Sequence, residues 1–183
     1  VVSGEEYYLA NTDNAYYDGK NKYRSFDSAG WWSSGAAPCA GNNYTVTNVV
    51  VGGAMTSGIQ LRVPDNPSLT DPVVFRGDRL TIGSPSDFNV QFMGWGTSQT
   101  TANRHQKSIY RIDDLHCYGA NIYCNNTGYI TLLGTCTIHK VDNNNHVTAF
   151  YGAGHVDGQQ RGMNLGMKLI ADADVVTRFY CYA

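Results

Sequence analysis

The sequence predicts an all-β fold, built either as a parallel β-helix or as a β-sandwich of the jelly-roll type. Asn, Gly, Thr, Ser and Tyr are abundant, whereas Lys and Glu, which favour surface helices, are scarce. Short runs of alternating apolar and polar residues are closed by Gly, Pro or Asn. Within residues 109–150 these runs recur at an even spacing, and that spacing favours the β-helix.

The spacing within residues 109–150 matches one coil of a three-faced β-helix. Four pairs of apolar residues are candidates to point inward: Leu115 with Cys117, Ile122 with Cys124, Ile130 with Leu132, and Cys136 with Ile138. The pairs begin 7, 8 and 6 residues apart, so three strands with their turns occupy about 21 residues, and the first and last pairs would stack. Antiparallel hairpins would show two-residue Asn-Gly or Asp-Gly turns, whereas these runs are joined by Gly119, Gly134 and Asn-rich corners.

The chain is predicted to form one domain of 183 residues, in which an aromatic-rich segment, residues 1–71, caps the coils of residues 72–183. The expected strands are 44–51, 59–63, 88–92, 109–112, 115–118, 120–124, 129–133, 136–141, 147–151, 164–170 and 175–182. Residues 94–107 and 152–163 are rich in Gly and polar residues, so we expect two long loops there.

The stretch 72–83 is expected to form a strand, a tight turn and a second strand. Gly77 suits a turn with positive φ, and Asp78 can hydrogen-bond its own backbone. Leu80 and Ile82 would then point to the same face, as residues two apart in a strand must. With the preceding arginine the turn spells Arg-Gly-Asp, an integrin-type tripeptide, but a turn clamped between two strands favours a structural role.

Composition excludes some classes of partner. Charged residues make up 15% of the chain and the net charge is −2 at pH 7, so neither nucleic acid nor an anionic membrane is expected as a partner. No apolar run is long enough to span a bilayer. The Asn- and Tyr-rich composition is typical of secreted or cell-surface bacterial proteins. Because the chain begins at Val1 without a leader, we interpret it as a mature form or an excised fragment.

The five cysteines form no Cys-x-x-Cys pair, and their odd number leaves at least one unpaired within the chain. They are Cys39, Cys117, Cys124, Cys136 and Cys181. A chain of this length does not need disulfides to fold, so we interpret most of them as small buried apolar residues.

The order of these features resembles the start of the right-handed β-helix regions of bacterial autotransporter-like and adhesin-like surface proteins. Three segments carry the resemblance: a start rich in Tyr and Trp, the run Phe75-Arg-Gly-Asp-Arg-Leu-Thr-Ile82, and the run Gly128-Tyr-Ile-Thr-Leu-Leu-Gly-Thr-Cys-Thr-Ile138. The resemblance implies a right-handed coil and a non-catalytic surface scaffold that belongs to a longer solenoid.

One group of residues could serve acid–base chemistry or a divalent metal. Asp114 and His116 share one face of a strand, Asp113 lies on the other, and His139 joins the first two if the pairs stack. The spacing matches no known metal signature. A solvated outer face is the favoured interpretation, so no catalytic residue, metal site or cofactor is predicted.

The candidate ligand-binding residues fall into two groups. His155, Asp157 and Arg161 lie in the Gly-rich segment, where a rigid scaffold would present them to a ligand. A polysaccharide lyase on this fold would use Asp157 and Arg161 together with Lys168.

Three tryptophans, Trp31, Trp32 and Trp95, could stack on sugar rings. Trp95, beside the expected loop 94–107, is the strongest of the three candidates.

The predicted function is that of a non-catalytic extracellular β-solenoid segment of an adhesin-like surface protein, which displays loops. The alternative is a carbohydrate-binding β-domain attached to a glycan-degrading enzyme, so a polysaccharide or cell-surface glycan is a candidate partner. An enzymatic role is disfavoured, because the two glutamates, Glu5 and Glu6, are adjacent and a two-carboxylate glycosidase would have to use Asp. Further coils or another subunit are expected beyond Ala183, since the strand 175–182 would otherwise be exposed.

Overall fold

A computed structural model describes residues 4–9, 26–27, 29, 32–47, 49–50, 53–54, 60–62, 70–95, 107–125, 128–151, 153–156, 159–172 and 174–180. The strands of these residues are β1 (Glu6–Tyr8), β2 (Asn43–Val46), β3 (Val49–Val50), β4 (Gly53–Ala54), β5 (Gln60–Arg62), β6 (Val73–Val74), β7 (Arg79–Ile82), β8 (Gln91–Trp95), β9 (Lys107–Tyr118), β10 (Asn121–Asn125), β11 (Gly128–His139), β12 (Ala149–Tyr151), β13 (Ala153–Val156), β14 (Gln159–Ala171) and β15 (Arg178–Tyr180). No helix in this part of the chain has the length and apolarity needed to cross a membrane.

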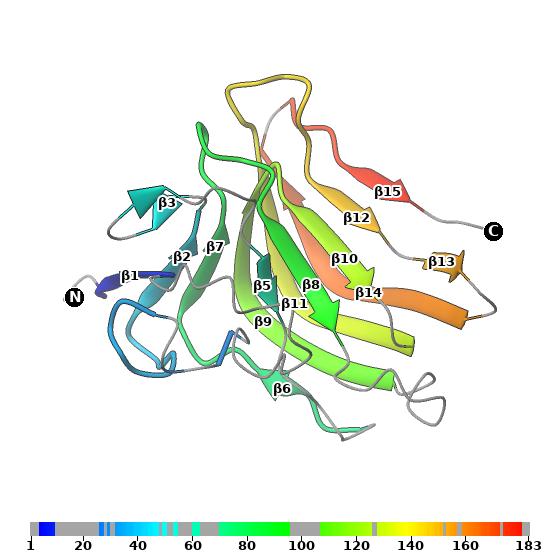
Figure 1. Ribbon diagram of the computed structural model, residues 1–183, viewed down its shortest axis with the longest axis horizontal. Helices are drawn as coiled ribbons and strands as arrows, with labels where there is room; N and C mark the ends of the chain where they lie inside the picture. The colour runs from blue at the N-terminus through cyan, green and yellow to red at the C-terminus, as the bar shows by residue number, and fades with distance from the viewer. Residues whose placement is uncertain are drawn as a thin grey trace.

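From β7 to β12 the strands alternate along the chain between a large and a small sheet, and β3 pairs with β4 in a separate two-stranded sheet. The large sheet has the order β1-β2-β7-β9-β11-β14-β13, with β6 beside β9, and the small sheet has the order β15-β12-β10-β8-β5. Within the described residues, β13 pairs antiparallel with β14, and the other pairs of these two sheets are parallel. From β7 to β14 the chain makes three turns, passing through the small sheet each time (Figure 1). The protein is therefore a parallel β-solenoid and not a sandwich; its right-handed sense stays a prediction.

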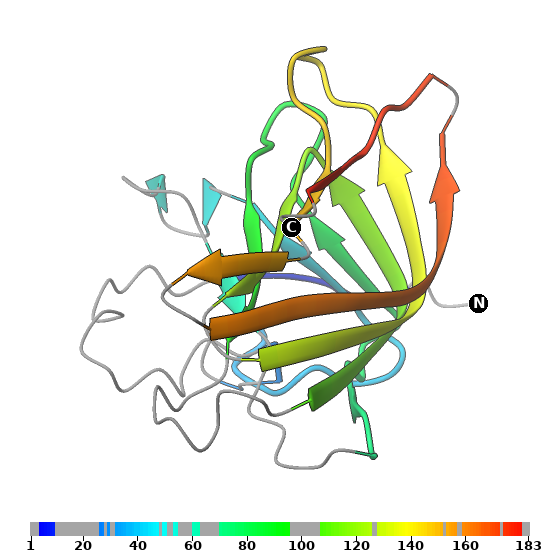
Figure 2. The ribbon, with the colours of Figure 1, turned by 90° about the vertical axis from the view of Figure 1, so that its right-hand side faces the viewer.

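The long strands β9, β11 and β14 bend together and so form two of the three faces of the solenoid (Figure 2). The sequence predicted two separate strands on either side of Gly134, but β11 continues through it. Gly134 has φ +117°, and a Cβ atom there would lie 1.8 Å from the carbonyl oxygen of Ile112 on β9. At this point β9 contributes one extra residue to the pairing, and such a bulge sharpens a bend.

The predicted coil of 21 residues is confirmed between β9 and β11, where Leu115 pairs with Cys136. The other turns of the large sheet are longer. Leu80 pairs with Leu115 and Cys136 with Leu169, which are 35 and 33 residues apart. The prediction of a loop at 152–163 was wrong, because residues 153–156 and 159–162 form a hairpin of β13 with β14, and this hairpin accounts for part of the difference.

Inward side chains stack in columns along the solenoid. Leu80, Leu115 and Cys136 form one column and Ile82, Cys117 and Ile138 the next, with each side chain no more than 1% exposed. The predicted inward direction of these residues is confirmed. The columns fill the space between the sheets, where parallel strands need apolar cover.

A cluster of buried aromatic rings closes the N-terminal end of the columns. Phe26, Tyr44, Phe75 and Tyr110 meet mainly edge to face, at centroid distances of 5.5–6.4 Å. Trp32 contacts Tyr44 at 4.9 Å and donates its indole hydrogen to the carbonyl of Phe26. Edge-to-face packing adds stability beyond that of the buried area, so the cluster ties the first residues of the chain to the coils.

The predicted strand, turn and strand of residues 72–83 are confirmed as β6, a bend and β7. The physical role of Gly77 differs from the expectation, because its φ is not positive. A Cβ atom at Gly77 would lie 2.5 Å from the ring of Tyr44, so glycine is needed here for space. Asp78 was expected to bond its own backbone, but its Oδ1 accepts a hydrogen bond from the backbone nitrogen of Gly41, 37 residues away, so it ties the turn to another segment.

The two ends of the solenoid differ. At the N-terminal end residues 32–33 cover β1, and the backbone nitrogen of Ser33 donates to the carbonyl of Tyr8. At the other end β15 is the outermost strand of the small sheet, and four large apolar side chains of the last coil are exposed: Leu169, Ile170, Val176 and Phe179. Stacks of Phe150 on Phe179 and of Tyr151 on Tyr180 end at this face.

The close approach at Gly134 predicts a specific cost. Replacing Gly134 with alanine should lower the free energy of unfolding by more than about 3 kcal/mol, because both the positive φ and the contact with Ile112 oppose a side chain. Gly35→Ala is the matched control, since Gly35 also has a positive φ but no atom within 4 Å of its added Cβ, and it should cost about 1 kcal/mol. Urea denaturation measures both; equal costs would contradict the assignment of Gly134 as the bend.

Candidate functional site

One corner of the solenoid gathers the ends of strands from both sheets. Trp95, the last residue of β8, pairs with Asn125, the last residue of β10. Gly128, which begins β11 only three residues after Asn125, pairs with Arg161 near the start of β14. We call this region the loop corner: the ends of β8 and β10 and the starts of β9, β11 and the β13–β14 hairpin. The long strands begin side by side at this corner (Figure 2).

The loop corner brings together the backbones of three predicted ligand-binding residues. Trp95, at the end of β8, pairs with Asn125. Gly128 follows Asn125 by three residues and pairs with Arg161 on the next strand. His155 pairs with Gln160 in the β13–β14 hairpin, one position from the pair of Gly154 with Arg161. Residues so far apart in sequence meet because each turn of the solenoid returns the chain to the same corner.

The other predicted residues are placed differently. Trp32 is 2% exposed inside the aromatic cluster, so it is a core residue and offers no face to a sugar ring. Trp31 and Asp157 lie outside the described residues. Lys168 is exposed on the far arm of β14, seven residues along the strand from Arg161, so the lyase set is spread along β14.

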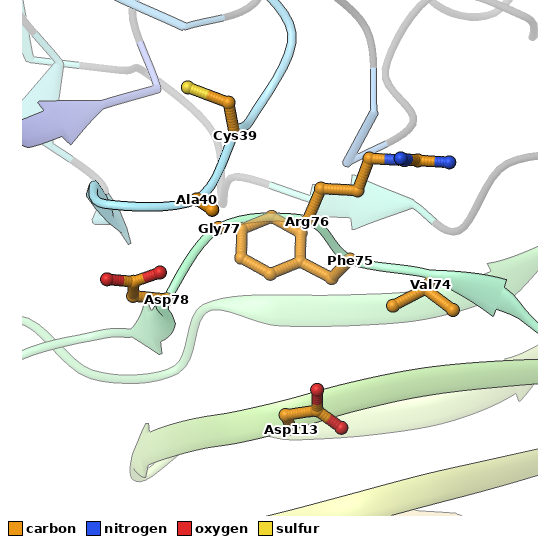
Figure 3. A pocket seen from close by; sticks show the side chains of 8 residues that line it. All are labelled: Cys39, Ala40, Val74, Phe75, Arg76, Gly77, Asp78 and Asp113. Carbon is orange, nitrogen blue, oxygen red and sulfur yellow. The ribbon is translucent and has the colours of Figure 1, made fainter.

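A hollow of about 540 Å³ lies beside the turn between β6 and β7 (Figure 3). Its lining consists of Cys39, Ala40, Val74, Phe75, Arg76, Gly77, Asp78 and Asp113. In Figure 3 the Arg76 side chain extends away from Asp78 and Asp113. The hollow therefore does not bring its cation together with its two carboxylates.

A chain of polar side chains crosses the outer face of the large sheet, and we call it the polar ladder. Arg79 Nε lies 3.0 Å from Asp114 Oδ2, and Asp114 Oδ1 lies 2.8 Å from His116 Nε2. His116 Nδ1 lies 2.7 Å from His139 Nε2, and His139 Nδ1 lies 2.5 Å from Asp172 Oδ2. The ladder thus joins β7, β9, β11 and the residue that follows β14.

The two imidazoles of the polar ladder are largely covered. Both side chains are 17% exposed, and the two ring planes are nearly parallel with their centroids 4.9 Å apart. Tyr118 covers the face of His139 at 4.3 Å with nearly parallel planes. Burial lowers the pKa of His116, and the Asp114 carboxylate opposes part of that effect.

The sequence predicted part of the polar ladder. Asp114, His116 and His139 do meet on one outer face. Asp113 does not follow the predicted alternation: it is exposed beside the separate hollow although Leu115 is buried, because the bulge of β9 falls between Ile112 and Leu115. Arg79 and Asp172 were missed. Both are polar residues that follow the outward alternation of their strands, β7 and β14. To predict that they join the ladder, one would also need the lengths of the coils that separate them from β9 and β11.

The two imidazoles of the polar ladder have no free ring nitrogen. Each of the four ring nitrogens already lies within hydrogen-bonding distance of a partner in the ladder. A histidine that acts as a general base needs a free ring nitrogen that faces substrate. Within the described ranges, no group of three or more His, Cys, Asp or Glu side chains could hold a metal ion.

Two cysteines lie in the core and one at the surface. Cys117 and Cys136 are buried, and the Cys136 thiol donates to Cys117 Sγ at 3.8 Å. This hydrogen bond, together with burial, raises the pKa of the Cys117 thiol well above its usual range. The prediction of small buried residues is confirmed for these two; Cys39 is exposed, and nothing is described of the side chains of Cys124 and Cys181.

Comparison with known proteins identifies no relative. No protein-family model matches the chain, no curated protein matches it, and no solved structure matches it. The geometry of the β-solenoid and its side chains is therefore the basis for any functional assignment.

The cysteine environments predict an order of alkylation. In the native protein at pH about 8, iodoacetamide should modify Cys39 and leave Cys117 and Cys136 unmodified, because only a solvent-accessible thiolate reacts. In urea the two core thiols should react as well. Peptide mass spectrometry measures each site separately, and native alkylation of Cys117 at the rate of Cys39 would contradict the packing of the columns.

Proposed function

We propose that the chain is a non-catalytic β-solenoid scaffold of an extracellular, adhesin-like surface protein, which presents its loops from one corner. The observation that carries the proposal is the loop corner, where β8 and β10 end and β9, β11 and the β13–β14 hairpin begin. Binding residues commonly lie on loops held by a rigid scaffold. The autotransporter-like resemblance of the sequence agrees with this role.

The distribution of polar groups supports a role without catalysis. Among the described residues, the closest set of titratable side chains is the polar ladder, whose ring nitrogens are all engaged. The hollow beside Phe75 has two carboxylates, but Asp78 is already bonded to the Gly41 backbone. Neither place combines a free base with an acid in the way that bond cleavage requires.

The asymmetry of the two ends supports a modular scaffold. The N-terminal end is covered by Trp32 and Ser33, while Phe179 is 54% and Val176 63% exposed at the other end. Phe179 pairs in register with the buried Phe150, so it lies at an inward position that a further layer would cover. A further coil or another subunit is the partner proposed for this end.

A second candidate function is carbohydrate binding at the loop corner. It is favoured by the meeting of Trp95, His155 and Arg161 there, since glycan sites combine an aromatic residue with polar groups. This function needs no catalysis and uses the same scaffold.

A glycan array and an activity panel test these proposals. The scaffold proposal predicts that the native protein releases neither reducing ends nor unsaturated products from any polysaccharide tested. Reproducible release that requires the native fold would contradict it.

The carbohydrate candidate predicts binding to at least one glycan and a loss of about tenfold or more in affinity on Trp95→Ala, because stacking on an aromatic ring would be lost. Tyr8→Ala is the matched control, since Tyr8 is 42% exposed on the outer face of β1. A failure of the native protein to bind any glycan, or an equal loss with both variants, would exclude the loop corner as the sugar site.

A further inference from the structure

The polar ladder holds one more hydrogen than two neutral imidazoles can supply. Carboxylate oxygens accept hydrogen bonds, so the nitrogens that face Asp114 and Asp172 carry hydrogens. The remaining nitrogens, His116 Nδ1 and His139 Nε2, face each other at 2.7 Å. Two lone pairs at this distance would repel, whereas one hydrogen between them makes a short hydrogen bond.

We propose that His116 and His139 share a single proton, and that this proton joins adjacent coils of the solenoid over a limited range of pH. With it, the ladder alternates in charge from Arg79 through Asp114 and the imidazole pair to Asp172. The two positive and two negative charges then balance along the ladder. The inference depends only on this geometry and is independent of the proposed function.

The surroundings favour one proton on the pair. The ring of Tyr118 lies flat against His139, and an aromatic face attracts a cation. The charged or titratable groups that contact the ladder's rings or carboxylates are Arg79 from β7, Asp114 and Tyr118 from β9, and Asp172 after β14. The two carboxylates accept hydrogen bonds from the rings, so their negative charges stabilise one extra proton on the imidazole pair.

A second proton is opposed. It would place two N–H groups against each other between His116 and His139 and put two positive charges on adjacent rings. Burial already lowers the pKa of His116, so the folded protein takes up this second proton less readily than the unfolded chain, whose histidines titrate near pH about 6.5.

The sign of the pH dependence follows from linkage. Below pH about 6.5 the unfolded chain binds more protons than the folded one, so stability falls as the pH falls through the lowered pKa of His116. As the pH rises through the value at which the shared proton leaves the folded protein, the central hydrogen bond is lost and stability falls again. The stabilising effect of the ladder is therefore greatest at intermediate pH, where the pair holds one proton.

Urea denaturation midpoints, measured with EDTA from pH about 4.5 to 9, test the proposal across the range in which histidines titrate. The native protein should show a maximum at intermediate pH. His139→Phe keeps a ring against Tyr118 but removes both nitrogens, so the maximum should flatten. His146→Phe is the matched control, because that ring packs on Phe88 away from the ladder and the maximum should remain. A maximum that persists in His139→Phe would overturn the proposal.

The ring nitrogens of the native protein give a readout that does not depend on a variant. ¹⁵N NMR should show His116 and His139 titrating together in two separated steps. Asp172→Asn keeps an acceptor oxygen but removes the charge, so the alkaline step should move down by about one pH unit. Single-step, independent titration of the two rings, or an unmoved alkaline step, would overturn the shared proton.

A metal ion is the competing occupant of the position between the two rings. Without EDTA, adding Zn²⁺ should leave the denaturation midpoint unchanged if a proton occupies the position. A Zn²⁺-dependent rise in the midpoint that disappears in His139→Phe would overturn the proposal and make the pair a metal site.

Discussion

The register between β9 and β11 is the constraint on which the rest of the structure depends. It sets Leu115 against Cys136 in the core and His116 beside His139 on the outer face. A slip by one residue would turn both columns outward and bury polar side chains, because strand side chains alternate. The close approach of Gly134 to Ile112 locates this register, since only one residue of β11 can meet that carbonyl. One local contact therefore organises both the core and the polar ladder.

The sequence was informative where coils are short and misleading where they contain insertions. The 21-residue coil could be found because the apolar pair that begins at Leu115 recurs at Cys136, and no insertion lengthens the coil between them. The next coil holds the β13–β14 hairpin, whose glycines resemble a loop when no partner strand is known. Asp114, His116 and His139 were predicted to meet, whereas Asp172 was missed, because its place in the stack depends on the 33-residue spacing of Cys136 and Leu169.

Glycine illustrates why local chemistry alone could not complete the prediction. Gly77 was expected to supply a positive φ, but the structure requires it because Tyr44 occupies the place of a side chain. That requirement comes from packing between segments more than thirty residues apart. The aromatic cluster has the same origin: Phe26, Trp32 and Phe75 were visible as aromatic residues, but their burial depends on tertiary contacts. Composition predicted aromatic burial without indicating which rings would be covered.

The polar ladder contributes to the stability of several coils because it crosses the interfaces between them. In a solenoid each coil contacts only its neighbours, so stability is approximately a sum of local terms and of the interfaces between coils. The aromatic cluster strengthens the interfaces near the N-terminal end, while the ladder crosses those of β7 with β9, β9 with β11 and β11 with the end of β14. The last coil has exposed apolar residues, and no strand in the described part of the chain covers it, so it is where local opening costs least. Asp172 joins this coil to His139, and a change of charge on the imidazole pair would therefore act first on the end of the solenoid that is least covered.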